Sequence, residues 1–274
     1  MRIDAHQHFW DPARGDYGWI PPGDAVLDRA YGPADLWPMM QAAGVDGTVL
    51  VQAAPTLAET EWLLEIAAAT PFVQGVVGWI DFDDPGQRRE LDRLARHPKM
   101  LGLRPMVQDI ADPDWINGPS VQWAFAAIMD HDLTFDALGL PRHLEPFRRL
   151  FRRYPGLRAV VDHGMKPAIR DSAFDKWAEG IARIAGETGA FCKLSGLVTE
   201  AAPGWTDATL APYATHLLAS FGPDRVMWGS DWPVCGLRAP YGDWHAAAQR
   251  LTAHLPTRDR DRIFGGTAKA FYAL

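Results

Sequence analysis

Eight short apolar runs, rich in β-branched residues, recur along this chain and constrain its fold more than any other feature. They lie at 3–8, 47–52, 73–80, 101–106, 133–138, 157–163, 190–195 and 226–231. Successive runs begin roughly 25–40 residues apart, which is room for a strand, a helix and two loops. Helical patterns fill intervals at 56–70, 86–97, 144–154, 172–188 and 206–221. The pattern predicts an α/β fold, a single (β/α)8 TIM barrel domain over residues 1–274, with an active site at the C-terminal ends of its strands.

A doubly wound open sheet is the competing fold. Such sheets usually have fewer strands and often carry a glycine-rich phosphate turn after the first one. Here the first run leads straight into His6-Gln7-His8, without such a turn. A long segment rich in Gly, Pro and Asp, residues 10–32, follows this run. We expect it to form a lid over the mouth of the barrel.

Composition excludes several classes of protein. The 274 residues are 47% hydrophobic and carry a net charge of −7, which excludes disorder and leaves no basic surplus for a nucleic-acid partner. No apolar run is long enough to span a membrane, no signal peptide is evident, and two cysteines fit a reducing compartment. We therefore expect a cytoplasmic protein with a small-molecule substrate and no membrane partner. The sequence does not decide whether the chain forms a homo-oligomer.

Two histidines close the first strand. Residues i and i+2 of a strand point to one face, so Asp4, His6 and His8 are expected to share a face at the barrel mouth. Two imidazoles one pleat apart can bind a metal ion or a polarised oxygen. The alternative is a pair of histidines held in a hydrogen-bond network, and two such residues at the end of an apolar strand favour the functional interpretation.

Two more strand ends supply partners for these histidines. His163 ends the sixth run, and Asp231 ends the eighth, which neighbours the first in a closed barrel. Gly229, which has no side chain, leaves room next to Asp231. A carboxylate among imidazoles can bind a metal, act as general base for water, or do both. The alternative for Asp231 is a helix cap.

Five further residues are expected to contact the substrate. Arg104 would reach the mouth from the fourth strand, where a guanidinium suits a lactone carbonyl or a developing carboxylate. Lys193 lies on the inner face of the seventh strand, and Gln52 and Asp136 end the second and fifth runs, so each could hold a sugar hydroxyl. Trp232 lies in a mouth loop beside a proline, where an aromatic residue can wall a pocket.

Five segments carry a resemblance to a known family. HQHFWD at 6–11, DHGMKP at 162–167, CKLSGL at 192–197, GSDWPV at 229–234 and GGTAKAFY at 265–272 resemble the amidohydrolase superfamily. Within it they resemble the sugar lactonase branch, the L-fuconolactone and L-rhamnonolactone hydrolases. The resemblance implies a (β/α)8 barrel whose polar centre comprises His6, His8, His163 and Asp231.

The chain departs from the binuclear amidohydrolases, which carry a bridging lysine or glutamate on strand four and a histidine on strand five. Here the fourth run reads Gly-Leu-Arg-Pro at 102–105 and the fifth Phe-Asp-Ala at 135–137. This departure predicts at most one divalent metal ion, and both a required and a dispensable metal stay possible. If one ion is bound, we expect zinc, because imidazole and carboxylate ligands suit it.

The expected reaction is hydrolysis of a sugar 1,4- or 1,5-lactone to its aldonic acid. Asp231 would deprotonate the attacking water, and either the protonated Asp231 or His163 would protonate the departing ring oxygen. A related decarboxylase, or a lactonase of pyrone dicarboxylates, would need more inward cations than Arg104 and Lys193. A catalytically silent barrel that serves as a binding protein is disfavoured because buried imidazoles and carboxylates are costly without a role.

Overall fold

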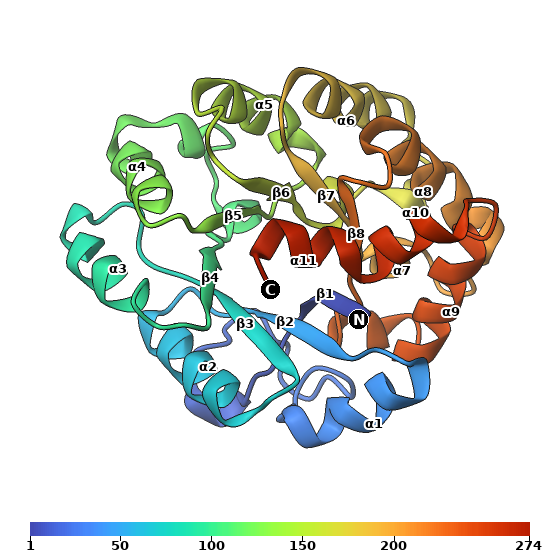
Figure 1. The fold of residues 1–274 in the computed structure, drawn as a ribbon, viewed down its shortest axis with the longest axis horizontal. Helices are drawn as coiled ribbons and strands as arrows, with labels where there is room; N and C mark the ends of the chain where they lie inside the picture. The colour runs from blue at the N-terminus through green and yellow to red at the C-terminus, as the bar shows by residue number, and fades with distance from the viewer.

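Eight parallel strands form one sheet in the order β1 to β8. In this computed structural model, which describes all residues 1–274, the strands are Ile3–Gln7, Gly47–Val51, Val73–Gly78, Met100–Leu103, Thr134–Ala137, Ala159–Val161, Phe191–Leu194 and Val226–Trp228. The first and last strands lie side by side, since Asp231 N donates to His6 O and His8 N donates to Trp232 O, both at 2.8 Å. The closed (β/α)8 barrel is confirmed (Figure 1).

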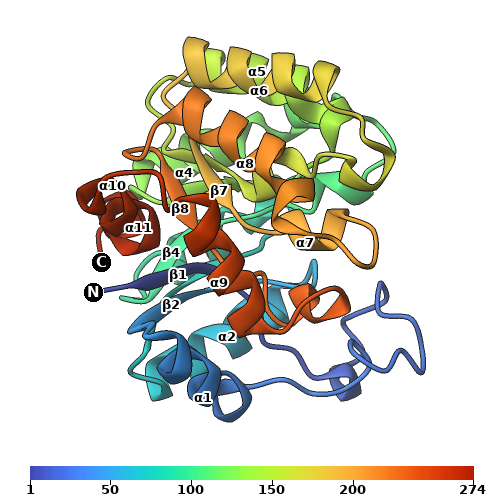
Figure 2. The same cartoon turned by 90° about the vertical axis from the view of Figure 1, so that its right-hand side faces the viewer.

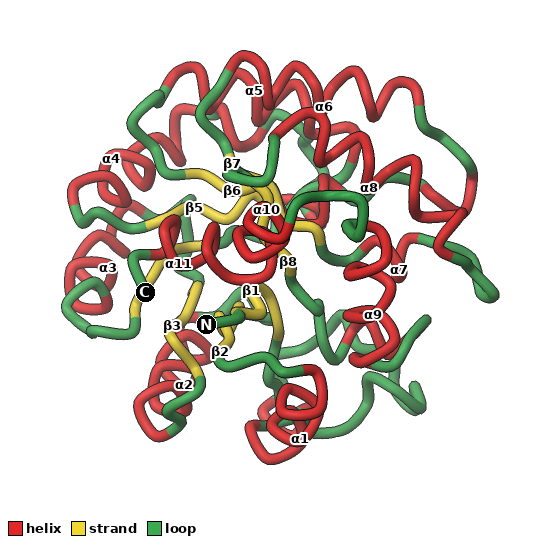
Figure 3. Tube along the Cα trace, turned by 45° about the vertical axis from the view of Figure 1, so that its right-hand side comes forward, coloured by secondary structure: helices red, strands yellow, loops and turns green.

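Helices surround the strands in a ring (Figure 3). The five expected helical stretches correspond to α2, α3, α5, α6 and α8. The sequence pattern did not predict the remaining helices. The helices are α1 Pro33–Ala43, α2 Leu57–Ala69, α3 Arg88–Leu94, α4 Gln122–Asp130, α5 Leu144–Arg153, α6 Asp175–Glu187, α7 Leu197–Glu200, α8 Asp207–Phe221, α9 Tyr241–Leu251, α10 Thr257–Asp261 and α11 Thr267–Tyr272. None of them is both long and apolar enough to cross a membrane.

The core has two parts. The larger part lies between the strands and the helices, and the smaller fills the barrel interior. Helix α11 closes one end of the barrel, near both termini, and contributes Phe271 and Tyr272 to the interior cluster (Figures 1 and 2). The blue segment that follows β1 projects at the other end of the barrel, so the site must be sought there (Figure 2).

A β-bulge interrupts β1. Asp4 pairs with Thr48 but Gln7 pairs with Leu50, so three steps on β1 span two on β2. Ile3 and Ala5 consequently face the barrel interior, while Asp4 accepts a hydrogen bond from Ser230 N at 2.8 Å. The prediction that Asp4 shares the face of His6 and His8 is therefore wrong, because the bulge breaks the simple alternation.

The segment 10–32 packs on itself. Trp10, Tyr17, Ile20 and Leu27 form a small buried cluster with the loop after β2. Trp19, 37% exposed, donates its indole N–H to Ala53 O at 2.7 Å. The segment thus lies beside the mouth in a defined conformation, and its role as a lid stays a prediction.

Candidate active site

Four polar side chains converge at the mouth of the barrel. His6 and His8 come from the end of β1, His163 from the turn after β6, and Asp231 from the turn after β8. Asp231 Oδ1 lies 3.7 Å from His6 Nε2, 3.4 Å from His8 Nε2 and 3.7 Å from His163 Nε2. The structure thus brings together all four residues that the sequence assigns to the polar centre.

Unusual backbone geometry aims two of these residues. His163 has a φ of 53° and Asp231 a φ of 57°, in the left-handed region that non-glycine residues rarely adopt and that often marks functional sites. Gly229 permits the close approach of β8 to β1, because a β-carbon there would lie 2.7 Å from the Cβ of His6.

The outer ring nitrogens of the histidines have partners of their own. His8 Nδ1 lies 2.8 Å from Val51 O and must donate to it, which leaves the Nε2 lone pair directed at the cluster. His163 Nδ1 lies 2.8 Å from Ser195 Oγ. These contacts fix the ring orientations, as second partners of metal-binding histidines commonly do.

The charge state of the cluster follows from its burial. Burial lowers the pKa of His163 to about 4, against the opposing charge of Asp231, and burial likewise lowers the pKa values of His6 and His8. Burial alone would raise the pKa of Asp231, but His163, His8 and His6 hold it below its ordinary value. Near neutral pH the centre therefore presents neutral imidazoles and one ionised carboxylate.

This donor set fits a divalent cation. Three ligand atoms, one from each of His6, His163 and Asp231, all lie within 4.8 Å of one another. His8 Nε2, 3.2 Å from His6 Nε2, adjoins this group. Neutral imidazole nitrogens with a carboxylate oxygen are ligands that divalent transition metals prefer.

A buried ion network lies beneath the cluster. Lys193 Nζ is 2.5 Å from Asp136 Oδ2 and 3.0 Å from Asp162 Oδ1, and Tyr272 donates its hydroxyl to Asp136 at 2.9 Å. Burial raises the pKa of Asp136 to about 6, against the charge of Lys193. The side chains of Lys193 and Asp136, expected to contact substrate, are fully buried and line no part of the cavity that opens above the cluster.

Asp162 is a site residue that the sequence analysis missed. Its Oδ1 lies 3.4 Å from His6 Nδ1, and its Oδ2 lies 3.5 Å from a guanidinium nitrogen of Arg104. Burial would raise the pKa of Asp162, but Lys193 and His6 hold it well below its ordinary value. Its place directly before His163 at a strand end was the available signal.

A cavity of about 140 Å³, the catalytic cavity, opens above the cluster. Its wall includes His8, His163 and Asp231, together with the cations Arg104 and Lys166.

Only Arg104 of the five expected substrate contacts lines this cavity. Gln52 is buried behind it and accepts a hydrogen bond from Arg104 at 2.7 Å. Trp232 is buried against Tyr31, with ring centroids 5.1 Å apart. These two residues therefore support the wall rather than form it.

Lys166 and Gln108 line the cavity and were not foreseen. Lys166 Nζ donates to Gln108 Oε1 at 2.7 Å. Lys166 belongs to the DHGMKP segment, three residues after His163, and that position was the only signal in the sequence.

Comparison with known proteins gives consistent matches over the whole chain. The amidohydrolase family model matches residues 3–274. An L-fucono-1,5-lactonase of Burkholderia ambifaria is 43% identical over 278 aligned residues, which cover 100% of this chain and 96% of that protein. An L-fucono-1,5-lactonase of Burkholderia multivorans is 36% identical, with 100% and 96% covered. The crystal structure of an amidohydrolase from Burkholderia multivorans with bound Zn superposes with a TM-score of 0.95 at 35% identity, covering 100% of this chain and 99% of that one.

Proposed function

This chain belongs to the amidohydrolase family, and we propose that it hydrolyses sugar lactones, with L-fucono-1,5-lactone the foremost candidate, to the open aldonic acids. The main support for the proposal is the cluster of His6, His8, His163 and Asp231, of which the last three line a cavity of about 140 Å³. The full-length likeness to two L-fucono-1,5-lactonases supports the choice of substrate class.

His6, His8, His163 and Asp231 would hold one divalent ion, and we propose zinc because three imidazoles and a carboxylate suit it. Such an ion, when bound, polarises a carbonyl oxygen and lowers the pKa of a water molecule. The bound Zn in the Burkholderia multivorans amidohydrolase supports this assignment.

Asp231 is the proposed general base. It is ionised near neutral pH because the surrounding imidazoles hold its pKa low, and it lies in the cavity wall. It would take a proton from water as the water oxygen bonds to the lactone carbonyl carbon. Arg104 and Lys166, both in the wall, would offset the negative charge that develops on the carbonyl oxygen and remains on the product carboxylate.

Collapse of the tetrahedral species breaks the bond between the carbonyl carbon and the ring oxygen. The proton held by Asp231 would pass to that ring oxygen, and His163, whose Nε2 lies 3.7 Å from Asp231 Oδ1, is placed to assist. The products are the ring-opened aldonate and one proton. No covalent enzyme intermediate is required.

The alternative substrates fit less well. An aromatic carboxylate or a pyrone dicarboxylate brings one or two permanent negative charges into the cavity. Of the cations near the mouth, Lys193 is committed to the buried network, and the two that remain in the cavity wall, Arg104 and Lys166, are already assigned to the charge that develops at the carbonyl group. A neutral lactone needs no additional cation.

The test is a pH-indicator assay across a panel of aldono-1,4- and 1,5-lactones, with spontaneous opening subtracted. Each turnover releases one proton, so the enzyme rate is read directly. We expect turnover of L-fucono-1,5-lactone or another six-carbon or 6-deoxy sugar lactone. Failure across the panel, together with decarboxylation of an aromatic acid, would reassign the reaction.

A further inference from the structure

A second and larger cavity adjoins the catalytic cavity. It measures about 670 Å³, against about 140 Å³, and the two share Trp19 and Met106 in their walls. We call it the tryptophan groove, after Trp19, Trp79 and Trp115 in its lining. The catalytic chemistry described above makes no use of it, although a volume of about 300–1,000 Å³ is typical of small-molecule sites.

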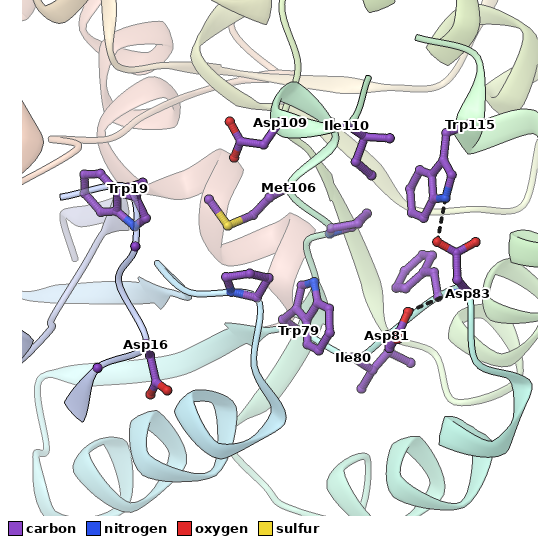
Figure 4. Close-up of a pocket in the computed structure, with 15 residues that line it drawn as sticks. Asp16, Trp19, Trp79, Ile80, Asp81, Asp83, Met106, Asp109, Ile110 and Trp115 are labelled. Atoms are coloured by element: carbon purple, nitrogen blue, oxygen red, sulfur yellow. Dashed lines mark hydrogen bonds between the residues drawn. The ribbon is translucent and has the colours of Figure 1, made fainter. Parts of the chain in front are cut away.

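The three indoles give the groove flat apolar walls. Figure 4 shows Trp19 at one end and Trp115 at the other, with Trp79 and Met106 between them. Trp19 donates its N–H to Ala53 O at 2.7 Å, and Trp115 donates to Asp83 Oδ2 at 2.8 Å. Because these two N–H groups are engaged by the protein, Trp19 and Trp115 offer the groove the apolar surface of their rings, which can pack against the C–H faces of other rings.

The polar part of the lining has one sign of charge. Asp16, Asp81, Asp83 and Asp109 contribute carboxylates, and no lysine or arginine lines the groove. Carboxylate oxygens accept hydrogen bonds from hydroxyl groups and repel anions. Flat apolar walls with carboxylate acceptors suit a neutral, polyhydroxylated ring.

We propose that the tryptophan groove is a second sugar subsite, which binds a glycosyl unit attached to a hydroxyl of the lactone held in the catalytic cavity. This inference rests on the proposed function. The shared wall at Trp19 and Met106 places the groove directly beside the lactone, so one glycosidic bond can join the two rings. The substrate class is then the lactone of a disaccharide, and its supply requires oxidation of a disaccharide at the reducing end. Hydrolysis opens the lactone and leaves the glycosidic bond intact.

The experiment compares kcat/KM for aldono-1,5-lactones that carry a neutral glycosyl group on O2, O3 or O4 with kcat/KM for the same unsubstituted lactones. The wild type should open at least one substituted lactone as efficiently as its parent. The quantity compared is the ratio of kcat/KM for the substituted lactone to kcat/KM for its unsubstituted parent. In Trp79→Ala and in Trp115→Ala, this ratio should fall by about tenfold or more. Trp79→Phe keeps a flat ring and should restore most of the ratio.

The matched control is Trp37→Ala. Trp37 is 38% exposed on α1 and stacks on Phe72 with ring centroids 4.9 Å apart, and it lines neither cavity. This variant should keep the wild-type ratio. Two results would overturn the subsite and leave the proposed function standing. In the first, the wild type opens the parent lactones efficiently but every substituted lactone more than about 100-fold more slowly. In the second, the ratio is unchanged in both Trp79→Ala and Trp115→Ala. If no lactone of either kind is opened, the proposed function and the subsite fall together.

Discussion

One buried carboxyl group, that of Glu59 in α2, should make the free energy of unfolding fall as pH rises. Glu59 is fully buried and accepts hydrogen bonds from Ala54 N at 2.8 Å and Ala53 N at 3.0 Å. Burial raises its pKa from 4.5 to about 7, against these two hydrogen bonds. Between these two pH values the unfolded chain loses a proton that the folded chain retains, so the contribution of Glu59 to stability falls through this window and is constant outside it. At 1.36 kcal/mol per pH unit, the loss amounts to about 3 kcal/mol.

The variant Glu59→Gln removes this titration and keeps an amide oxygen to accept a backbone hydrogen bond. Urea unfolding followed by tryptophan fluorescence, from about pH 4.5 to about pH 8, gives the free energy of unfolding of each protein. The difference, wild type minus Glu59→Gln, should fall by about 3 kcal/mol over this range, whatever its constant part. Glu65→Gln, which changes an exposed residue of the same helix, should follow the wild-type profile. A difference that stays constant within about 1 kcal/mol would show that Glu59 does not hold a proton in the folded protein through this pH range.

Four further predictions concern the site. In Gly229→Ala the new β-carbon would lie 2.7 Å from the Cβ of His6, so divalent metal affinity measured by titration should weaken, by about 10–100-fold, with circular dichroism unchanged. Ser195→Ala removes the partner 2.8 Å from His163 Nδ1 and should weaken affinity over a similar range of about 10–100-fold; unchanged binding would mean that the hydroxyl does not orient the ring. Arg104→Lys keeps the charge but loses the planar fork, so kcat/KM for the lactone should fall by about tenfold, and an unchanged value would exclude a directional role. Elemental analysis of the purified protein should find no more than one divalent ion per chain, whereas two would contradict a mononuclear centre.

The sequence was sufficient to predict the barrel and the polar centre. Eight apolar runs, five of the intervals between them helical in pattern, leave few alternatives to the barrel, and His8, His163 and Asp231 each come at or just beyond the end of a strand. In a parallel barrel those ends meet at one face. Their meeting is thus a consequence of topology.

Local departures from regular geometry were not predictable. The bulge in β1 reverses the face of Asp4, and no residue in that strand signals it. The positive φ values of His163 and Asp231 are set by surrounding packing, since neither residue type requires them.

The depth of an inward-facing side chain within the barrel could not be predicted from the sequence either. Alternation along a strand predicts that Asp136 and Lys193 face inward, but it does not tell whether a side chain reaches the cavity or the layer beneath it. Their pairing with each other and with Asp162 satisfies their charges below the cluster. Lys166 reaches the cavity from a turn, and periodicity says nothing about turns.

Asp231, within the cluster of three histidines, is the proposed general base for the opening of a sugar lactone. The most direct measurement is kcat/KM for L-fucono-1,5-lactone, by proton release above the spontaneous rate, in the wild type and in Asp231→Asn. The variant keeps the size of the side chain and removes its basicity, so the rate should fall by at least about 10²-fold while circular dichroism shows an intact fold. A variant that retains more than about a tenth of the wild-type value would contradict the account, and the base would then have to be sought elsewhere in the cavity.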